Sequence, residues 1–196
     1  MPRKNRRVAN GPLRTRQRAR RGLLVACAFA LGASACGSTA TSLSNAAQHQ
    51  RDALIEKGIG AQRAGDATKA AADYEAALVI DKTSATAHYD LGDVQQLDLG
   101  EGAAAISNYK MALSVEPMLA SALFNLAILE TAHDPKAAAS AYRRLIALDS
   151  SDAPARWNLG YVLVSAGKTK AGIAEIARAL QLDPALSSRA GSTPRG

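Results

Sequence analysis

Two short motifs recur along this chain with a period close to 34 residues. The first motif is an aromatic or apolar residue, a polar residue, then usually Leu and a small residue, and its copies are Ile55-Glu56-Lys57-Gly58, Tyr89-Asp90-Leu91-Gly92, Phe124-Asn125-Leu126-Ala127 and Trp157-Asn158-Leu159-Gly160. The second motif starts at Tyr74, Tyr109, Tyr142 and Ile176, with spacings of 35, 33 and 34 residues. Two motifs that keep one phase over four copies predict a stacked array of one supersecondary unit.

Each unit contains two apolar segments at helical spacing, and Ala and Leu dominate them, because aromatic residues make up only 4% of the chain. This composition favours closely packed helices over sheets. The pattern predicts eight helices, over 52–64, 67–80, 84–98, 102–115, 118–132, 135–148, 152–166 and 169–182.

The period, the paired helices and the prolines that close two units (Pro117 and Pro184) resemble the tetratricopeptide repeat. The resemblance covers residues 51–184 and implies an all-α, right-handed superhelix of about four antiparallel helix hairpins. The repeats run over about 51–84, 85–119, 120–152 and 153–186. Small residues are expected where the two helices of a hairpin cross, and the tyrosines of the second motif should fill the space toward the next repeat.

Two of the turns within hairpins depart from the common length. The spacing between the two motifs is one residue longer across the 99–102 turn and one residue shorter around residues 133–135. Changes of length at surface turns disturb few contacts. Because the overall phase is restored, we expect one continuous superhelix.

The start of the chain has the three zones of a signal peptide, which we assign to residues 1–35. Residues 2–21 are basic, 23–31 are apolar, and an Ala-Ser-Ala-Cys sequence ends at Cys36. The apolar stretch is shorter than the ~20 residues of a membrane-spanning helix. This order predicts export from the cytoplasm.

Cys36 resembles the lipid-modified cysteine of a bacterial lipoprotein, which implies a membrane-anchored lipoprotein of the cell envelope with residues 36–50 as a flexible tether. No cysteine follows Cys36, so acylation would also remove the problem of a free exported thiol. Simple cleavage, a retained signal and a cytoplasmic chain with a basic tail are the alternatives.

The net charge of +7 comes from the expected signal peptide, and the rest of the chain is slightly acidic. Nine of the 24 Lys and Arg residues lie in the first 35 positions, which contain no acid, so 15 basic residues face 17 acidic ones in the rest of the chain. A nucleic-acid partner is therefore not expected.

The resemblance implies that the first helices of the hairpins line a concave groove that binds an extended peptide or a partner helix. The groove positions of the first repeat would be Ile55, Glu56 and Ile59. Those of the later repeats, our predicted peptide-binding residues, would be Tyr89, Asp90, Asp93, Phe124, Asn125, Ile128, Trp157, Asn158 and Tyr161. Because the groove carries acids, we expect a neutral or basic ligand held mainly by apolar contacts, and not a carboxylate clamp.

Nothing in the sequence has the spacing of a catalytic, cofactor or metal site. His49, His88 and His133 share no ligand spacing with Asp, Glu or Cys, and no phosphate-binding glycine loop is present. We therefore expect a binding scaffold that is not an enzyme and needs no cofactor.

The last helix lacks an evident capping element, because only Ala185 and Leu186 precede the tail at 187–196, which reads as disordered. The expected uncovered residues are Ile173, Ile176, Ala177 and Leu180. Self-association through helix 169–182, as an assembly module resembling pilotin-like lipoproteins, is one alternative function. A non-catalytic subunit of an envelope enzyme complex is another.

Overall fold

The computed structural model describes residues 43–189. The expected signal peptide, the acylation site Cys36 and residues 190–196 of the expected tail lie outside the described residues. In the described part every regular element is a helix, so the expected all-α class is confirmed.

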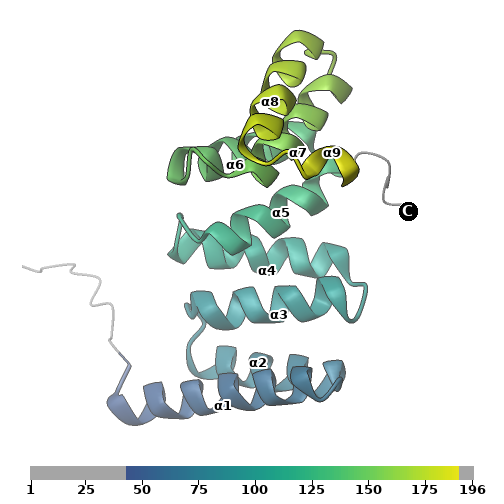
Figure 1. The fold of residues 1–196 in the computed structure, drawn as a ribbon. Helices are drawn as coiled ribbons and strands as arrows, with labels where there is room; N and C mark the ends of the chain where they lie inside the picture. Colours follow the sequence, from purple (N-terminus) through teal and green to yellow (C-terminus); the bar gives the residue numbers. More distant parts are fainter. Residues whose placement is uncertain (1–42, 190–196) are drawn as a thin grey trace, which may run out of the picture. The chain divides into compact units, whose positions relative to one another are not determined.

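Eight long helices form four hairpins that stack one on the next (Figure 1). They are α1 (Asn45–Arg63), α2 (Ala67–Ile80), α3 (Ala85–Leu97), α4 (Gly102–Val115), α5 (Ala120–His133), α6 (Pro135–Leu148), α7 (Ala153–Ser165) and α8 (Thr169–Leu182), and a short α9 (Leu186–Arg189) follows. Odd-numbered helices come first in each hairpin, and α2, α4 and α6 each pack between their own partner and the next hairpin. None of the described helices combines the length and the hydrophobicity needed to cross a bilayer.

The expected helix boundaries agree with the structure to within two residues, except at the two ends of the array. Helix α1 begins at Asn45, so residues 45–50 of the expected tether are helical. The earlier start has a local cause, because the Ser44 hydroxyl accepts a hydrogen bond from the amide of Ala47 and caps the helix. Residues 45–50 are mostly polar and lack the apolar spacing of a helix, so the sequence did not predict this extension.

The turns inside the hairpins explain the shorter spacing around residues 133–135. Three of these turns contain a glycine with positive φ: Gly65 at 78°, Gly100 at 71° and Gly167 at 76°. A residue without a side chain reverses the chain there without steric strain. The third hairpin turns at Asp134 alone, and Pro135 starts α6. The Asp134 carboxylate accepts hydrogen bonds from the amides of Lys136 and Ala137, which replaces the glycine turn by a direct cap.

The helices of each hairpin touch through a small residue, as expected. A Cβ atom added to Gly58 would lie 2.5 Å from the Tyr74 ring, and one added to Gly92 would lie 2.9 Å from the Tyr109 ring. The tyrosines Tyr74, Tyr109 and Tyr142 are almost completely buried in this position. The small residue and the aromatic ring therefore form one packing unit in each of the first two hairpins.

The fourth hairpin uses two glycines where Ile176 replaces tyrosine. A Cβ on Gly172 would lie 2.6 Å from the carbonyl oxygen of Gly160, so α7 and α8 meet backbone to backbone. This is closer than any side chain permits, and it follows from the presence of glycine on both helices.

The C-terminal end of the array is partly covered, which corrects the expectation of a bare last helix. Leu186 of α9 is only 3% exposed and packs with Ala153 and Ala179. Residues 187–189 of the expected disordered tail are thus helical. Ile173 is nevertheless 57% exposed, and self-association through residues 169–182 stays a prediction.

Gly172→Ala should destabilise the fold by about 1–3 kcal/mol, because the new methyl group forces α8 away from the α7 backbone. The measurement is urea unfolding followed by circular dichroism. Gly60→Ala is the matched control: Gly60 lies inside α1 with no atom within 4 Å of an added Cβ. The same change there should stabilise the fold by about 0.5–1 kcal/mol. Equal effects at the two positions would contradict the close approach of α7 and α8.

Candidate functional site: the A-helix face

The first helices of the four hairpins, α1, α3, α5 and α7, line one surface of the array, which we call the A-helix face. Hydrogen bonds across this face join α1 to α3 and α3 to α5. The Gln62 amide of α1 donates to Asp93 of α3 (Nε2 to Oδ2, 3.4 Å), and the Asn125 amide of α5 donates to the same carboxylate (Nδ2 to Oδ1, 3.3 Å). The predicted peptide-binding residues on α3, α5 and α7 all belong to these first helices.

Hydroxyl groups of the core tyrosines belong to the same network. Tyr74 donates to Gln62 at 3.3 Å, and Tyr109 donates to Gln96 at 2.8 Å while it accepts from Asn125 at 3.2 Å. Burial raises the pKa of Tyr74 to about 12, and burial also raises the pKa of Tyr109, so both hydroxyls keep their protons at neutral pH. The tyrosine rings lie in the core, and their hydroxyl groups form hydrogen bonds with side chains of the A-helix face.

Asp90 is the exception in this network. Among the described residues, no side chain or backbone amide donates a hydrogen bond to its half-buried carboxylate. Burial, and after it the charges of Asp93 and Glu56, raise its pKa to about 6. Burial also raises the pKa of Asp93, with opposing effects of the hydrogen bonds from Gln62 and Asn125. The two acids therefore differ in their hydrogen bonds: Asp93 accepts bonds from Gln62 and Asn125, and Asp90 accepts none from the described residues.

The aromatic residues of the first motif are half-buried and rest on their neighbours. Tyr89 lies 5.9 Å from Tyr109 between ring centroids, and Phe124 meets Tyr142 edge-on at 6.2 Å. Trp157 packs with the cluster of Ala153, Ala179 and Leu186. A large part of each ring serves packing, as expected when such residues stand at inter-repeat contacts.

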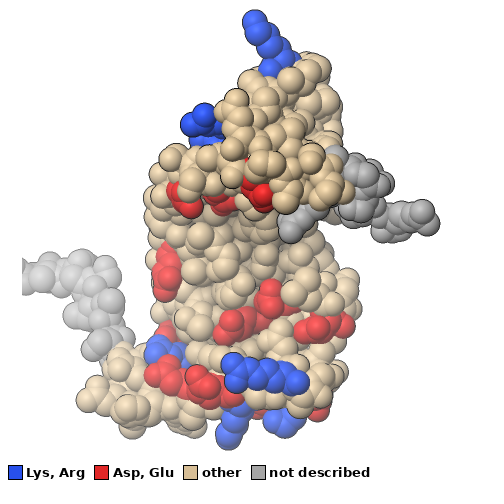
Figure 2. Space-filling model, viewed as in Figure 1, with Lys and Arg blue, Asp and Glu red and all other residues tan. Residues whose placement is uncertain are grey.

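Exposed apolar side chains lie mainly at the α5 and α7 part of this face. Ile128 is 42% exposed, Tyr161 45% and Val164 37%. Tyr161 stands edge-on to Trp157, with 5.2 Å between ring centroids. Figure 2 shows few charged side chains at the level of α5, with acidic side chains below it toward α1 and α3, near some Lys and Arg, and a second acidic group above it at the level of α6 and α7.

Not every expected position behaves as predicted. Ile55 was expected to face the groove, but it is only 7% exposed and packs in the core with Leu91 and Val94. Ile59 is half-buried against the same cluster. Ile55 therefore fills the contact of α1 with α2 and α3, and its side chain is not available to a groove. Glu56 is exposed, and Asn158 is half-buried on α7.

Sequence reasoning missed Gln62, Gln96 and Val164. Each lies three residues after an expected groove position, namely Ile59, Asp93 and Tyr161. Residues three apart share a helix face, so this spacing was the signal that could have found them.

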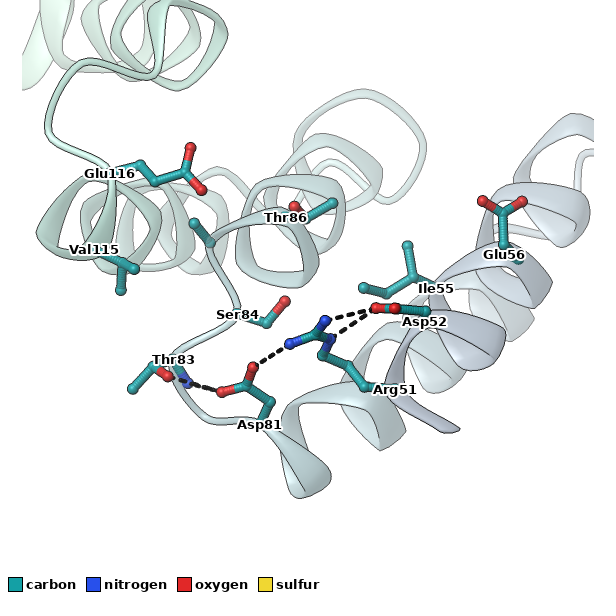
Figure 3. Close-up of a pocket in the computed structure, with 11 residues that line it drawn as sticks. Arg51, Asp52, Ile55, Glu56, Asp81, Thr83, Ser84, Thr86, Val115 and Glu116 are labelled. Carbon is teal, nitrogen blue, oxygen red and sulfur yellow. Dashed lines mark hydrogen bonds and ion pairs between the residues drawn. The ribbon is translucent and has the colours of Figure 1, made fainter. Parts of the chain in front are cut away.

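A polar cavity of about 420 Å³ opens beside Glu56, between the middle of α1 and the start of α3 (Figure 3). The Arg51 guanidinium lies between two acids, with Nη1 2.6 Å from Asp81 and Nη2 2.7 Å from Asp52. These pairs raise the pKa of Arg51, through the hydrogen bond to Asp81 first. Glu56 and Glu116 also line the cavity and have no ion pair among the described residues. The cavity thus holds more acidic than basic groups.

Within residues 43–189, no three His, Cys, Asp or Glu side chains are grouped so that they could hold a metal ion. His88 is buried and its ring nitrogens meet Asn108 (2.9 Å) and the carbonyl oxygen of Lys82 (3.1 Å), so its environment is that of a packed polar residue. The chemistry of the A-helix face is consequently that of contact, by hydrogen bonds, apolar side chains and charge.

Comparison with known proteins agrees with the internal repeat. Residues 128–187 match the family model described as tetratricopeptide repeat. No curated protein sequence is matched by the chain.

Similar solved structures extend across the array. Crystal structures of MamA and of YrrB, described as a TPR protein with an unusual peptide-binding site, are each 23% identical to this chain. The MamA comparison has a TM-score of 0.63 and covers 73% of this chain and 84% of that one; the YrrB comparison has a TM-score of 0.65 and covers 72% and 74%.

A third similar structure is the first TPR of Spaghetti (RPAP3) bound to an HSP90 peptide, 18% identical, with a TM-score of 0.56 and coverage of 61% of this chain and 94% of that one. These likenesses concern the fold. Residues 128–187 thus match the tetratricopeptide repeat family, and the similar structures show that the four-hairpin array has the fold of such proteins.

Proposed function

We propose that this protein is an interaction scaffold of the bacterial cell envelope that binds a peptide or partner helix on its A-helix face. The observation that carries the proposal is the exposure of Ile128, Tyr161 and Val164 on neighbouring helices of that face. Exposed apolar side chains gathered on one surface are typical of a protein-binding site.

Similar structures support this choice of role. YrrB is described as having an unusual peptide-binding site, and the Spaghetti domain is bound to an HSP90 peptide. Tetratricopeptide repeats are generally interaction modules without catalysis, and we assign this chain the same kind of role.

The envelope location rests on the sequence of the leader. We propose that the signal is cleaved before Cys36, that this cysteine is acylated, and that the array is held at the membrane by the lipid. An anchored scaffold would collect its partner at the membrane surface.

Mass spectrometry of the mature protein from the native host should find an N-terminal Cys36 that carries diacylglycerol. Cys36→Ala is the control and should abolish the added lipid mass. An intact Met1, or an unmodified N-terminus after residue 35, would contradict the anchor but leave the binding proposal untouched.

A photo-crosslinking residue at position 128 in living cells should give one dominant crosslinked partner. The matched control is position 79, because Val79 is 78% exposed but lies on α2, outside the A-helix face. Tyr161→Ala should weaken the crosslink from position 128 and leave the folded state intact, since 45% of that side chain is in solvent. Equal crosslinking from both positions would contradict a specific A-helix site.

Asp90 gives the proposal a pH-dependent test. An acid whose pKa is higher in the folded state than in the unfolded state destabilises the fold once it ionises. The penalty is absent below pH ~4 and complete above the folded pKa of about 6. Asp90→Asn should therefore stabilise the protein at pH 7.5 by roughly 1–3 kcal/mol and bring no such gain at pH 4.

The measurement is chemical denaturation at both pH values. Glu75→Gln, on an exposed position of α2, is the matched control and should change neither value. A loss of stability in Asp90→Asn at pH 7.5 would mean that the carboxylate has a stabilising partner. A natural residue that lowers stability in this way is more typical of a binding site than of a packing position.

A further inference from the structure

The A-helix face is divided into an apolar part and an acidic part. Ile128 on α5 and Tyr161 and Val164 on α7 expose their side chains to solvent. On α1 and α3 the same face carries Glu56, Asp90 and Asp93, beside one exposed apolar side chain, Leu97. A ligand that lies along the whole face meets both parts in turn.

The acidic part has a charge that is not neutralised internally. The amides of Gln62 and Asn125 donate to Asp93, and also to Asp98 and Tyr109 respectively, but not to Asp90. Asp90 receives no such bond, and the nearby negative charges of Asp93 and Glu56 make its ionised form less stable. Arg63, exposed in the last turn of α1, is a base near this end, and it forms no ion pair among the described residues.

The cavity beside Glu56 continues the acidic part toward the start of α1. Among the residues that line it, the only base is Arg51, which Asp52 and Asp81 already hold, and the remaining carboxylates belong to Glu56 and Glu116 (Figure 3). Val115, 43% exposed, forms an apolar wall. The long stem and cationic head of a Lys or Arg side chain match such a lining.

From these features we propose that the ligand of the A-helix face is a bipartite peptide segment, with Lys or Arg residues lying over α1 and α3 and apolar side chains lying over α5 and α7. This rests on the proposed function, since it specifies the ligand of the same surface. An approaching cation relieves the repulsion at Asp90 and Glu56, while the apolar side chains cover Ile128 and Tyr161. Charge selects and places the ligand, and apolar burial holds it.

The test uses the full chain and a short fluorescein-labelled peptide in which two lysines are followed by a Leu-Phe-Leu run, measured by fluorescence anisotropy. Two control peptides carry either glutamines in place of the lysines or serines in place of the apolar run. We expect the unmodified peptide to bind tightest, with an affinity that falls as salt is raised.

Two variants separate the two parts of the face. Asp90→Asn should weaken the lysine peptide about threefold to tenfold and leave the glutamine peptide unchanged. Ile128→Ser should weaken both peptides by a similar factor. Glu75→Gln and Val79→Ser, at exposed positions of α2, are the matched controls and should have no effect, and circular dichroism verifies that each variant is folded.

The outcomes distinguish the two proposals. If Ile128→Ser weakens binding but Asp90→Asn does not, the A-helix face binds peptides and the bipartite inference is wrong. If no peptide binds, or if Val79→Ser has the same effect as Ile128→Ser, the proposed function itself fails. If the chain dimerises in sedimentation and Ile128→Ser breaks the dimer, a second copy is the occupant, which also overturns the bipartite inference.

Discussion

The contact between a small residue on one helix and a large ring on its partner sets the geometry of this array. In the first two hairpins a tyrosine ring lies where even a methyl group on Gly58 or Gly92 would overlap it. The missing side chain lets the two helices approach, and the ring then fills the space toward the next hairpin. Since every later contact is built on that spacing, the orientation of the A-helix face depends on it as well.

The fourth hairpin reaches the same result with different residues. Ile176 is smaller than tyrosine, and a second glycine on α8 lets the two backbones touch. The loss of ring volume and the closer approach of the helices compensate one another, which explains how the repeat keeps its phase despite the change of residue type. A similar substitution accounts for the short turn at Asp134, where a side-chain cap takes the place of a glycine.

Most of the fold could be predicted from the sequence because the four copies of the repeat share one pattern, so each copy helps to locate the helices of the others. Helices α2, α4, α6 and α8 begin and end as expected, since Gly, Pro and capping Asp residues mark their limits. The two ends were harder to predict. Residues 45–50 and Leu186 have no counterpart in the other copies, so their structure depends on the Ser44 cap and on local packing against Ala153 and Ala179.

The candidate site was predictable in position but not in detail. The first motif located the helices of the A-helix face and most of the residues on it. It could not show that Ile55 packs in the core with Leu91 and Val94, because that contact depends on how α1 lies against α3. Nor could it show that Asn125 bonds Asp93 and leaves Asp90 alone, because the choice between two acids three residues apart depends on distances between helices.

Tyr109 belongs to two environments at once. Its ring holds two helices of a hairpin together, and its hydroxyl group is bonded on the face where Asn125 and Gln96 meet. Any molecule that rearranges those hydrogen bonds also alters the energy with which successive hairpins stack. Tyr109 therefore connects the packing inside a hairpin to the hydrogen bonds of the A-helix face.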